Sequence, residues 1–265
     1  LPGIRRTRPL VDEDTWKNDV ESLRESIRQG TLRKAVLSQA LDVTLERPFD
    51  LRPVYEALTA TYPNCFRFAF AGQESTTGDD TATFFGASPE PLVSKTGTEI
   101  ETAALAGTIG RGEDSQADSE LAARMRADPK IREEHGVVIE HLDRRLSSIG
   151  RGVSVADRVI RRLENVQHLQ SLISATVEEG THVLDVVEHL HPTPAVGGVP
   201  PRAAMEAIED LEPLDRGWYA APVGWFDEAG DGTFAVGIRS AVAQRRQATV
   251  FAGNGIVGES DPEDE

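Results

Sequence analysis

The sequence is poor in the features that mark disulfide-bonded, membrane-spanning or nucleic-acid-binding proteins. It has one cysteine, Cys65, so no disulfide can form within the chain. It has no apolar run of the roughly 18 residues that a membrane-spanning helix needs. It has 28 basic and 44 acidic residues, and the resulting net charge of −16 repels the phosphates of nucleic acids and of anionic membranes. We therefore expect neither nucleic acid nor a membrane among its partners.

Lysine is also scarce: it occurs only at positions 17, 34, 95 and 130 (Lys17, Lys34, Lys95 and Lys130), and the other basic residues are arginines. With so many acidic residues, this composition is typical of a halophile or of a GC-rich genome, although a merely acidic protein is equally compatible with it. The first residues show no charged head followed by an apolar centre, so we expect a cytoplasmic protein. The 265 residues, 39% of them hydrophobic, fit one large globular domain.

The spacing of apolar residues predicts both helices and strands. Apolar residues with a helical period follow Asp12 and stop at Gly30, whereas residues Leu32 to Leu45 alternate in polarity as a strand does, with Lys34 opposite the mainly apolar face. The polar stretch Gln73 to Asp80 is expected to be a loop. Further helices are predicted at 54–62, 133–148, 183–189 and 202–210, and further strands at 66–70, 83–85, 92–94, 99–105, 218–226, 233–243 and 248–251.

This order of elements, with strands at both ends and helices in the middle, favours an α+β fold with mainly antiparallel sheets. The glycine-rich segment Gly107 to Gly112 offers backbone amides and an arginine to an anion, but it lacks the pattern of a nucleotide-binding loop and is expected to be a simple turn. The histidines His168, His189 and His191 have no zinc-type spacing, so each is expected to make ordinary hydrogen bonds.

Two kinds of carboxylate stand out. Glu90 lies between Pro89 and Pro91, whose fixed φ angles hold its side chain at a strand end. Glu134 lies near the start of a helix and Glu265 lies in the acidic terminus, and carboxylates of this kind, with open water positions, are what Mg²⁺ binds. Taken alone, each of these glutamates is expected to be a solvated surface group.

Taken together, the motifs are similar to those of the chorismate-utilising enzymes, and within them to the isochorismate synthases. The resemblance runs from Leu32 to the last residue and follows the order of the family's motifs. The matching segments are 33–38 (RKAVLS), 86–90 (GASPE), 104–108 (ALAGT), 134–138 (EHGVV), 166–169 (VQHL), 190–198 (LHPTPAVGG), 215–219 (DRGWY), 234–240 (FAVGIRS), 253–257 (GNGIV) and 260–263 (SDPE). The resemblance implies two stacked, mainly antiparallel β-sheets flanked by helices with a central cleft, formed by residues 1–265 as one chorismate-binding catalytic domain.

Particular positions indicate which member of the family the chain resembles. Lys34 stands where the isochorismate and salicylate synthases have lysine, whereas the ammonia-using anthranilate and aminodeoxychorismate synthases typically have glutamine. Ala106 stands where the aminodeoxychorismate type has a lysine that forms a covalent adduct. We therefore expect water to be the nucleophile and no amidotransferase subunit to be needed. Isochorismate synthase is the main interpretation, and the alternatives are salicylate synthase, anthranilate synthase component I and a non-catalytic chorismate-binding module.

The resemblance also implies roles for individual residues. Lys34 is the implied general base that activates water, and Glu90 is the implied general acid for the departing C4 hydroxyl of chorismate. The implied Mg²⁺ ligands are Glu134 and Glu265. The implied substrate-binding residues are Gly107, Thr108, His168, Tyr219, Arg239 and Gly253.

The chain departs from the family pattern at several points. Gln39 replaces an arginine of the first motif, and Asn254 replaces an alanine of the closing motif, so pocket details at both positions are uncertain in this comparison. The N-terminal portion of the family, and a principal Mg²⁺ ligand three residues beyond Glu265, have no counterpart in these residues. We therefore expect weak Mg²⁺ binding and a mobile segment after about Gly258.

Overall fold

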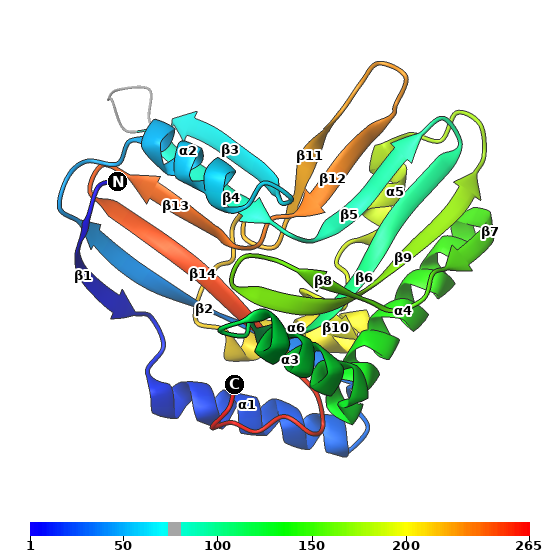
Figure 1. Cartoon of the computed structure of the whole chain (residues 1–265), viewed down its shortest axis with the longest axis horizontal. Helices are drawn as coiled ribbons and strands as arrows, with labels where there is room; N and C mark the ends of the chain where they lie inside the picture. The colour runs from blue at the N-terminus through cyan, green and yellow to red at the C-terminus, as the bar shows by residue number, and fades with distance from the viewer. Residues whose placement is uncertain (74–80) are drawn as a thin grey trace.

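The computed structural model describes residues 1–73 and 81–265. It contains two seven-stranded antiparallel sheets, as predicted (Figure 1). In the first sheet the strand order is β1-β2-β14-β13-β4-β3 with β10 beside β2, and in the second it is β11-β12-β5-β6-β9-β7 with β8 beside β9. The predicted loop Gln73 to Asp80 lies outside the described residues except for Gln73, which ends β3.

The bounds of the elements are as follows. The first sheet comprises β1 (Ile4–Pro9), β2 (Lys34–Leu45), β3 (Phe66–Gln73), β4 (Thr81–Ser88), β10 (Gly198–Val199), β13 (Ser240–Gln244) and β14 (Gln247–Ile256). The second comprises β5 (Pro91–Thr96), β6 (Glu99–Gly110), β7 (Gly150–Val155), β8 (Val159–Arg162), β9 (Val166–Val177), β11 (Pro222–Phe226) and β12 (Gly232–Val236). The helices are α1 (Glu13–Arg28), α2 (Leu51–Thr61), α3 (Ser115–Ala127), α4 (Pro129–Ile149), α5 (Val183–Leu190) and α6 (Pro201–Leu211).

Alternation along β2 separates the core from the site. Its odd-numbered residues Ala35 and Leu37 pack with Trp16, Val20 and Leu23 of α1 in one apolar cluster. Helix α1 forms where the sequence predicted it, because the Asp12 side chain accepts a hydrogen bond from the main chain of Thr15 and caps the first turn. The even-numbered residues of β2 point to the opposite face, where the second sheet lies.

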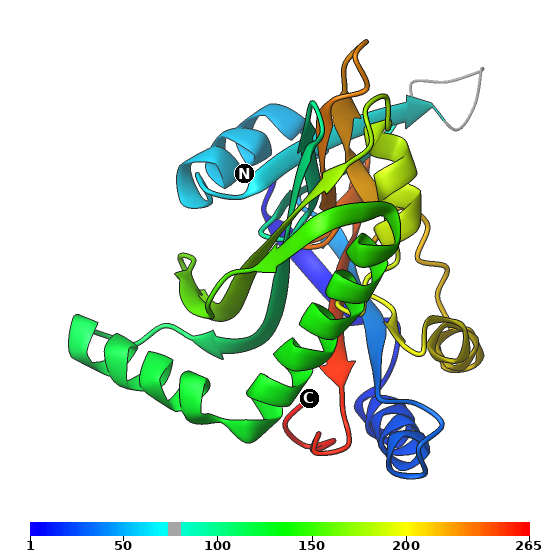
Figure 2. The same ribbon diagram turned by 90° about the vertical axis from the view of Figure 1, so that its right-hand side faces the viewer.

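The helices flank the two sheets, and Figure 2 shows the long helix α4 running along one side of the molecule. The apolar residues Val138, Leu142 and Leu146 of α4 join the largest core cluster, which also contains residues of β6 and β9. The predicted helices at 54–62, 133–148, 183–189 and 202–210 are confirmed as α2, α4, α5 and α6. No helix among the described residues is long and apolar enough to cross a membrane.

The structure also corrects several predictions. The single strand expected at 233–243 is two strands, β12 and β13, which belong to different sheets, and Gly237 to Arg239 link them. The strand expected at 218–226 begins only at Pro222, because turns occupy 217–220. The segment from Gly107 is no simple turn: β6 continues to Gly110 with a bulge at Gly107, whose φ of +69° suits glycine.

Candidate active site

A cavity of about 280 Å³ lies between the two sheets. Strands β2 and β14 of the first sheet form one wall, and β6 and β9 of the second sheet form another. The structure brings every predicted site residue except Glu265 to this cavity. These residues are Lys34, Glu90, Gly107, Thr108, Glu134, His168, Tyr219, Arg239 and Gly253.

Lys34 is the first residue of β2 and is buried, with 2% of its surface exposed. Its Nζ lies 3.0 Å from Oε1 of Glu134, which comes from α4. The two side chains meet beside Gly255 of β14, where a Cβ atom would lie 2.6 Å from the same Glu134 oxygen. A larger residue at 255 would therefore displace the ends of these two side chains from their present contact.

Glu90 has an environment that favours a protonated carboxyl group. It is 7% exposed, follows β4, and its main-chain NH donates to Oγ of Ser88 at 3.1 Å. Burial raises the pKa of Glu90 to about 7, although the charge of Lys34 and a hydrogen bond with Thr193 lower it in part. A carboxylic acid with this pKa can donate a proton near neutral pH.

His168 connects the end of β6 to Arg239. Its Nδ1 lies 3.1 Å from both the carbonyl oxygen of Gly107 and Oγ1 of Thr108, and its Nε2 lies 3.2 Å from Nη2 of Arg239. Because a guanidinium only donates, Nε2 must accept, and the ring hydrogen is on Nδ1. Burial lowers the pKa of His168 to about 4, which agrees with this neutral ring.

Tyr219 forms another side of the cavity. Its ring stacks on Phe251 of β14, with centroids 5.1 Å apart, and burial raises the pKa of its phenol. A Cβ atom at Gly253 would lie 2.8 Å from the Tyr219 hydroxyl oxygen. The glycine therefore allows the phenol group to approach the strand closely.

Sequence reasoning did not assign a role to Arg216, which also lines the cavity. Its guanidinium donates to the main-chain oxygens of Val196 at 2.6 Å and Val36 at 2.8 Å, and its Nε donates to Glu212 at 2.7 Å. Glu212 in turn accepts from the main-chain NH of Ser38 at 2.6 Å. Arg216 belongs to the quoted segment 215–219, so the motif was the available signal, but only the fold shows which cavity walls it joins.

The two predicted Mg²⁺ ligands approach the end of β14 from different sides. Glu134 borders Gly255 and reaches the cavity, whereas Oε1 of Glu265 is 2.6 Å from Nζ of Lys130, and its main-chain oxygen accepts from Asn254. Among the described residues, no three histidine, cysteine, aspartate or glutamate side chains converge on one point. Mg²⁺ often takes only one or two carboxylates plus substrate and water oxygens. Both carboxylates contact a lysine, but Glu134 lines the cavity and fits such a ligand, whereas Glu265 does not line it.

The two residues that depart from the family's motifs, Gln39 and Asn254, do not line the cavity. Gln39 pairs with Ala252 in the ladder between β2 and β14.

The segment after Gly258, which was expected to be mobile, is packed against the rest of the protein. Ser260 is 1% exposed, and Glu263 pairs with Lys17 of α1 at 2.7 Å.

Comparisons with known proteins agree with this geometry. The family of chorismate binding enzymes matches residues 4–265. The chain belongs to this family. The same fold is seen in the crystal structure of DhbC from Bacillus anthracis. That structure superposes with a TM-score of 0.94 at 33% identity, over 100% of this chain and 71% of that one.

Two curated members of the family are similar in sequence. Isochorismate synthase MenF of Bacillus subtilis is 35% identical over 95% of this chain and 52% of its own length. The salicylate biosynthesis isochorismate synthase of Pseudomonas aeruginosa is 39% identical over 93% of this chain and 50% of its own length. The chain thus spans about half the length of these two relatives.

Proposed function

We propose that this chain is an isochorismate synthase, which converts chorismate to isochorismate by adding water at C2 with loss of the C4 hydroxyl. One observation carries the proposal: a buried lysine, Lys34, and a buried carboxyl group with a pKa of about 7, Glu90, line the same cavity. Two family members that are similar in sequence are named isochorismate synthases, which supports the same reaction.

In the proposed mechanism Lys34 is the general base. Its neutral amine takes a proton from the water molecule that forms the new bond to C2 of the ring. Glu134, whose Oε1 lies 3.0 Å from Nζ, accepts a hydrogen bond from this amine and holds it in place. Removing this base is expected to slow the reaction by about 10² to 10⁴-fold, the usual range for a general base.

Glu90 completes the reaction as the general acid. It donates its proton to the C4 oxygen, so that the C4–O bond breaks and water leaves. One water molecule is consumed at C2 and one is released at C4, and the substrate and product therefore have the same composition. The proline on each side of Glu90 restricts the backbone and keeps the carboxyl group in one position.

Binding of the dianionic substrate needs positive charge within an acidic protein. Arg239 has this charge available, because in the described part of the chain its guanidinium donates to the neutral ring of His168 rather than to a carboxylate. We propose that Arg239 and Tyr219 hold one substrate carboxylate, since the planar guanidinium suits bidentate binding. Gly107, Thr108 and Gly253 would contribute main-chain groups to the pocket.

We propose Mg²⁺ as the cofactor, with Glu134 as a protein ligand and Glu265 in a lesser role. When bound, the ion would polarise the substrate ring through its carboxylate and neutralise part of the substrate's charge. Calorimetric titration of Mg²⁺ in the presence of chorismate tests this assignment. Glu134→Gln should weaken the metal binding strongly and Glu265→Gln only slightly, and equal losses in the two variants would contradict the different roles.

We also propose how the chain is organised, where it acts and which pathway it serves. Residues 1–265 would act as one catalytic domain, in the cytoplasm, without an amidotransferase subunit. The product could serve menaquinone or siderophore synthesis, which are pathways associated with enzymes of this kind. Salicylate synthase remains the alternative, because it would form isochorismate and then eliminate pyruvate from it.

Identification of the product decides among these functions. The chain is incubated with chorismate and Mg²⁺, with and without an ammonium salt, and the products are separated by chromatography. Isochorismate as the sole product supports the proposal. Salicylate with pyruvate would indicate the alternative, anthranilate would indicate ammonia as the nucleophile, and unchanged chorismate that is nevertheless bound would indicate a non-catalytic module.

A further inference from the structure

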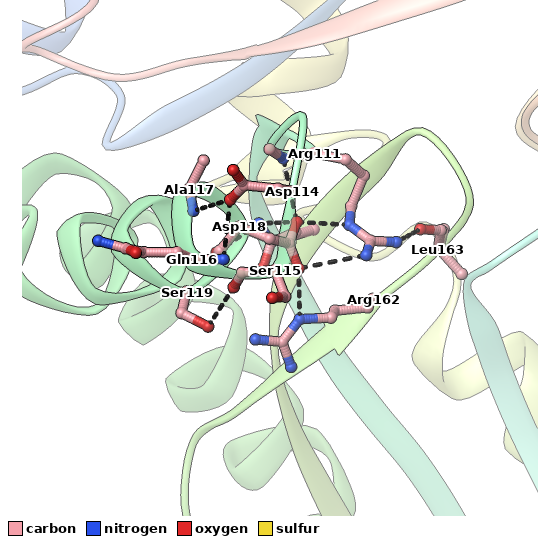
Figure 3. Close-up of polar contacts among 11 residues, drawn as sticks. Arg111, Asp114, Ser115, Gln116, Ala117, Asp118, Ser119, Arg162 and Leu163 are labelled. Carbon is pink, nitrogen blue, oxygen red and sulfur yellow. Dashed lines mark hydrogen bonds and ion pairs between the residues drawn. The ribbon is translucent and has the colours of Figure 1, made fainter.

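Asp118 of α3 is not among the residues that line the cavity, and it is buried although it is charged. Figure 3 shows its polar contacts with Arg111 and Arg162. Only 6% of its surface is exposed. Its Oδ1 accepts from Nε of Arg111 at 2.6 Å, from the main-chain NH of Gly112 at 3.1 Å and from Nε2 of Gln167 at 3.0 Å. Its Oδ2 accepts from Nε of Arg162 at 2.9 Å. One carboxylate therefore joins four segments of the chain.

The partners of Asp118 continue directly into the cavity wall. Arg111 and Gly112 follow the end of β6, which carries Thr108, and Gln167 immediately precedes His168 on β9. Thr108 pairs with His168 in the ladder between these strands. A displacement of either strand end would therefore move the groups that line the cavity.

Two further features show that the geometry around Asp118 is tight. Arg111 also donates to the main-chain oxygen of Leu163 at 2.6 Å, which braces the turn between β8 and β9. A Cβ atom at Gly112 would lie 2.1 Å from the main-chain nitrogen of Asp118, so only glycine allows this approach. Bonds of this kind between charged groups are stronger than neutral ones, and they resist fraying at the two strand ends.

We propose that Asp118 is a positioning residue, which fixes the cavity wall formed by the ends of β6 and β9 so that it binds substrate. This inference rests on the proposed function, because the substrate to be positioned is chorismate. Lys34 and Glu90 come from other segments, and the partners of the Asp118 side chain in the described residues are Arg111, Gly112, Arg162 and Gln167 instead. The network should therefore act on substrate binding more than on the chemical step.

The test is Asp118→Asn in the full chain. The amide places donor hydrogens against the arginine side chains, so the network cannot form as it does now. We expect the KM for chorismate to rise about tenfold, a loss of about 1.4 kcal/mol of binding free energy, because the displaced strand ends carry groups that line the cavity. The kcat should stay within about threefold of the unchanged protein.

A matched control separates positioning from stability. Asp231→Asn removes the ion pair with buried Lys95, whose N–O distance is 2.6 Å, and Asp231 is not a residue that lines the cavity. It should lower Tm and leave the KM unchanged. If Asp118→Asn lowered Tm in the same way and also left the KM unchanged, Asp118 would be merely structural and the inference would be wrong.

Two additional measurements keep the test decisive. If Asp118→Asn does not fold, Arg162→Ala removes a single contact of the network and should raise the KM about twofold to threefold, whereas an unchanged KM would overturn the inference. If the unchanged protein makes no isochorismate, the proposed function fails. Calorimetry then decides on Asp118 alone: weaker chorismate binding by Asp118→Asn supports positioning, and equal binding contradicts it.

Discussion

Glu90 and Asp118 are both buried carboxyl groups, yet their acidities move in opposite directions. Glu90 is 7% exposed and burial raises its pKa to about 7, whereas Asp118 is 6% exposed and the Arg111 guanidinium holds its pKa at about 2. The exposed fractions are thus similar, but Glu90 lies deep between the sheets, where desolvation dominates, whereas Asp118 lies nearer the surface with two partly exposed arginines. Glu90 faces Lys34, a lysine already paired with Glu134, while Asp118 accepts hydrogen bonds from two arginines.

In the proposed mechanism, this difference separates the carboxyl group that takes part in the reaction from the carboxylate that holds the cavity wall in place. A carboxyl group that keeps its proton near neutral pH can donate it to a leaving group. A carboxylate that stays charged at all working pH values can hold strand ends in a fixed position. The predictions below sharpen the comparison, from the largest expected effect to the smallest.

The largest effect is expected for the two groups assigned to the chemistry. Lys34→Gln and Glu90→Gln should each lower turnover of chorismate by about 10² to 10⁴-fold, because the amide can act neither as base nor as acid. Matched controls are Lys17→Gln and Glu56→Gln, whose side chains form ion pairs at the surface. Turnover above about a tenth of the unchanged protein in either cavity variant would remove that residue from the mechanism.

The pH dependence of the reaction tests the protonation of Glu90. Since the acid form is needed, kcat/KM should fall about tenfold for each pH unit above about 7, where the Glu90 carboxyl loses its proton. His168 stays neutral through this range, because its pKa is about 4. A falling limb that begins near pH 5 would mean that burial does not control the acidity of Glu90.

Stability offers a test of the same shift without substrate. The pKa of Glu90 rises from 4.5 to about 7 on folding, so its contribution is present below pH about 4.5 and is lost as the pH rises through about 7. Relative to Glu90→Gln, the unchanged protein should lose about 3 kcal/mol of unfolding free energy over this range, at about 1.4 kcal/mol per pH unit. Urea denaturation at both ends measures the difference. Parallel curves for the two proteins would show that no shift occurs.

Salt should have the smallest effect. The 44 acidic residues repel one another, and raising the ionic strength from about 0.1 M to about 1 M shortens the screening length from roughly 10 Å to roughly 3 Å. We expect Tm to be a few degrees higher in about 1 M KCl than in about 50 mM KCl. Scanning calorimetry at both salt concentrations measures this, and a Tm that stays level or falls would mean that the acidic composition is incidental.

The sequence predicted the elements in which apolar periodicity and turns agree. It also singled out Glu90, because the prolines on both sides of this residue restrict its backbone. The other cavity residues were indicated by the family's motifs. Helix α3 was missed, since one of its buried positions is the charged Asp118, which reads as a surface residue. The strand at 233–243 was predicted as one element because apolar residues continue through the crossover to the other sheet.

Neither the Asp118 network nor the role of Arg216 could be predicted, for the same physical reason. Both depend on which strand ends meet in space, and a single sequence does not show the partners of a buried charge. The Thr193 side chain, which hydrogen-bonds Glu90, likewise comes from a segment about a hundred residues away along the chain. Motifs indicate which residues matter, whereas the fold shows what each of them contacts.

The most direct test of the account is the origin of the oxygen atom at C2 of the product. The chain converts chorismate in water enriched in ¹⁸O, and mass spectrometry locates the label in isochorismate. The account predicts one ¹⁸O atom at C2 in each product molecule, because Lys34 activates a solvent water while Glu90 releases the original C4 oxygen. Unlabelled isochorismate would mean that the C4 hydroxyl migrates within the substrate, and it would contradict the assigned roles of both residues.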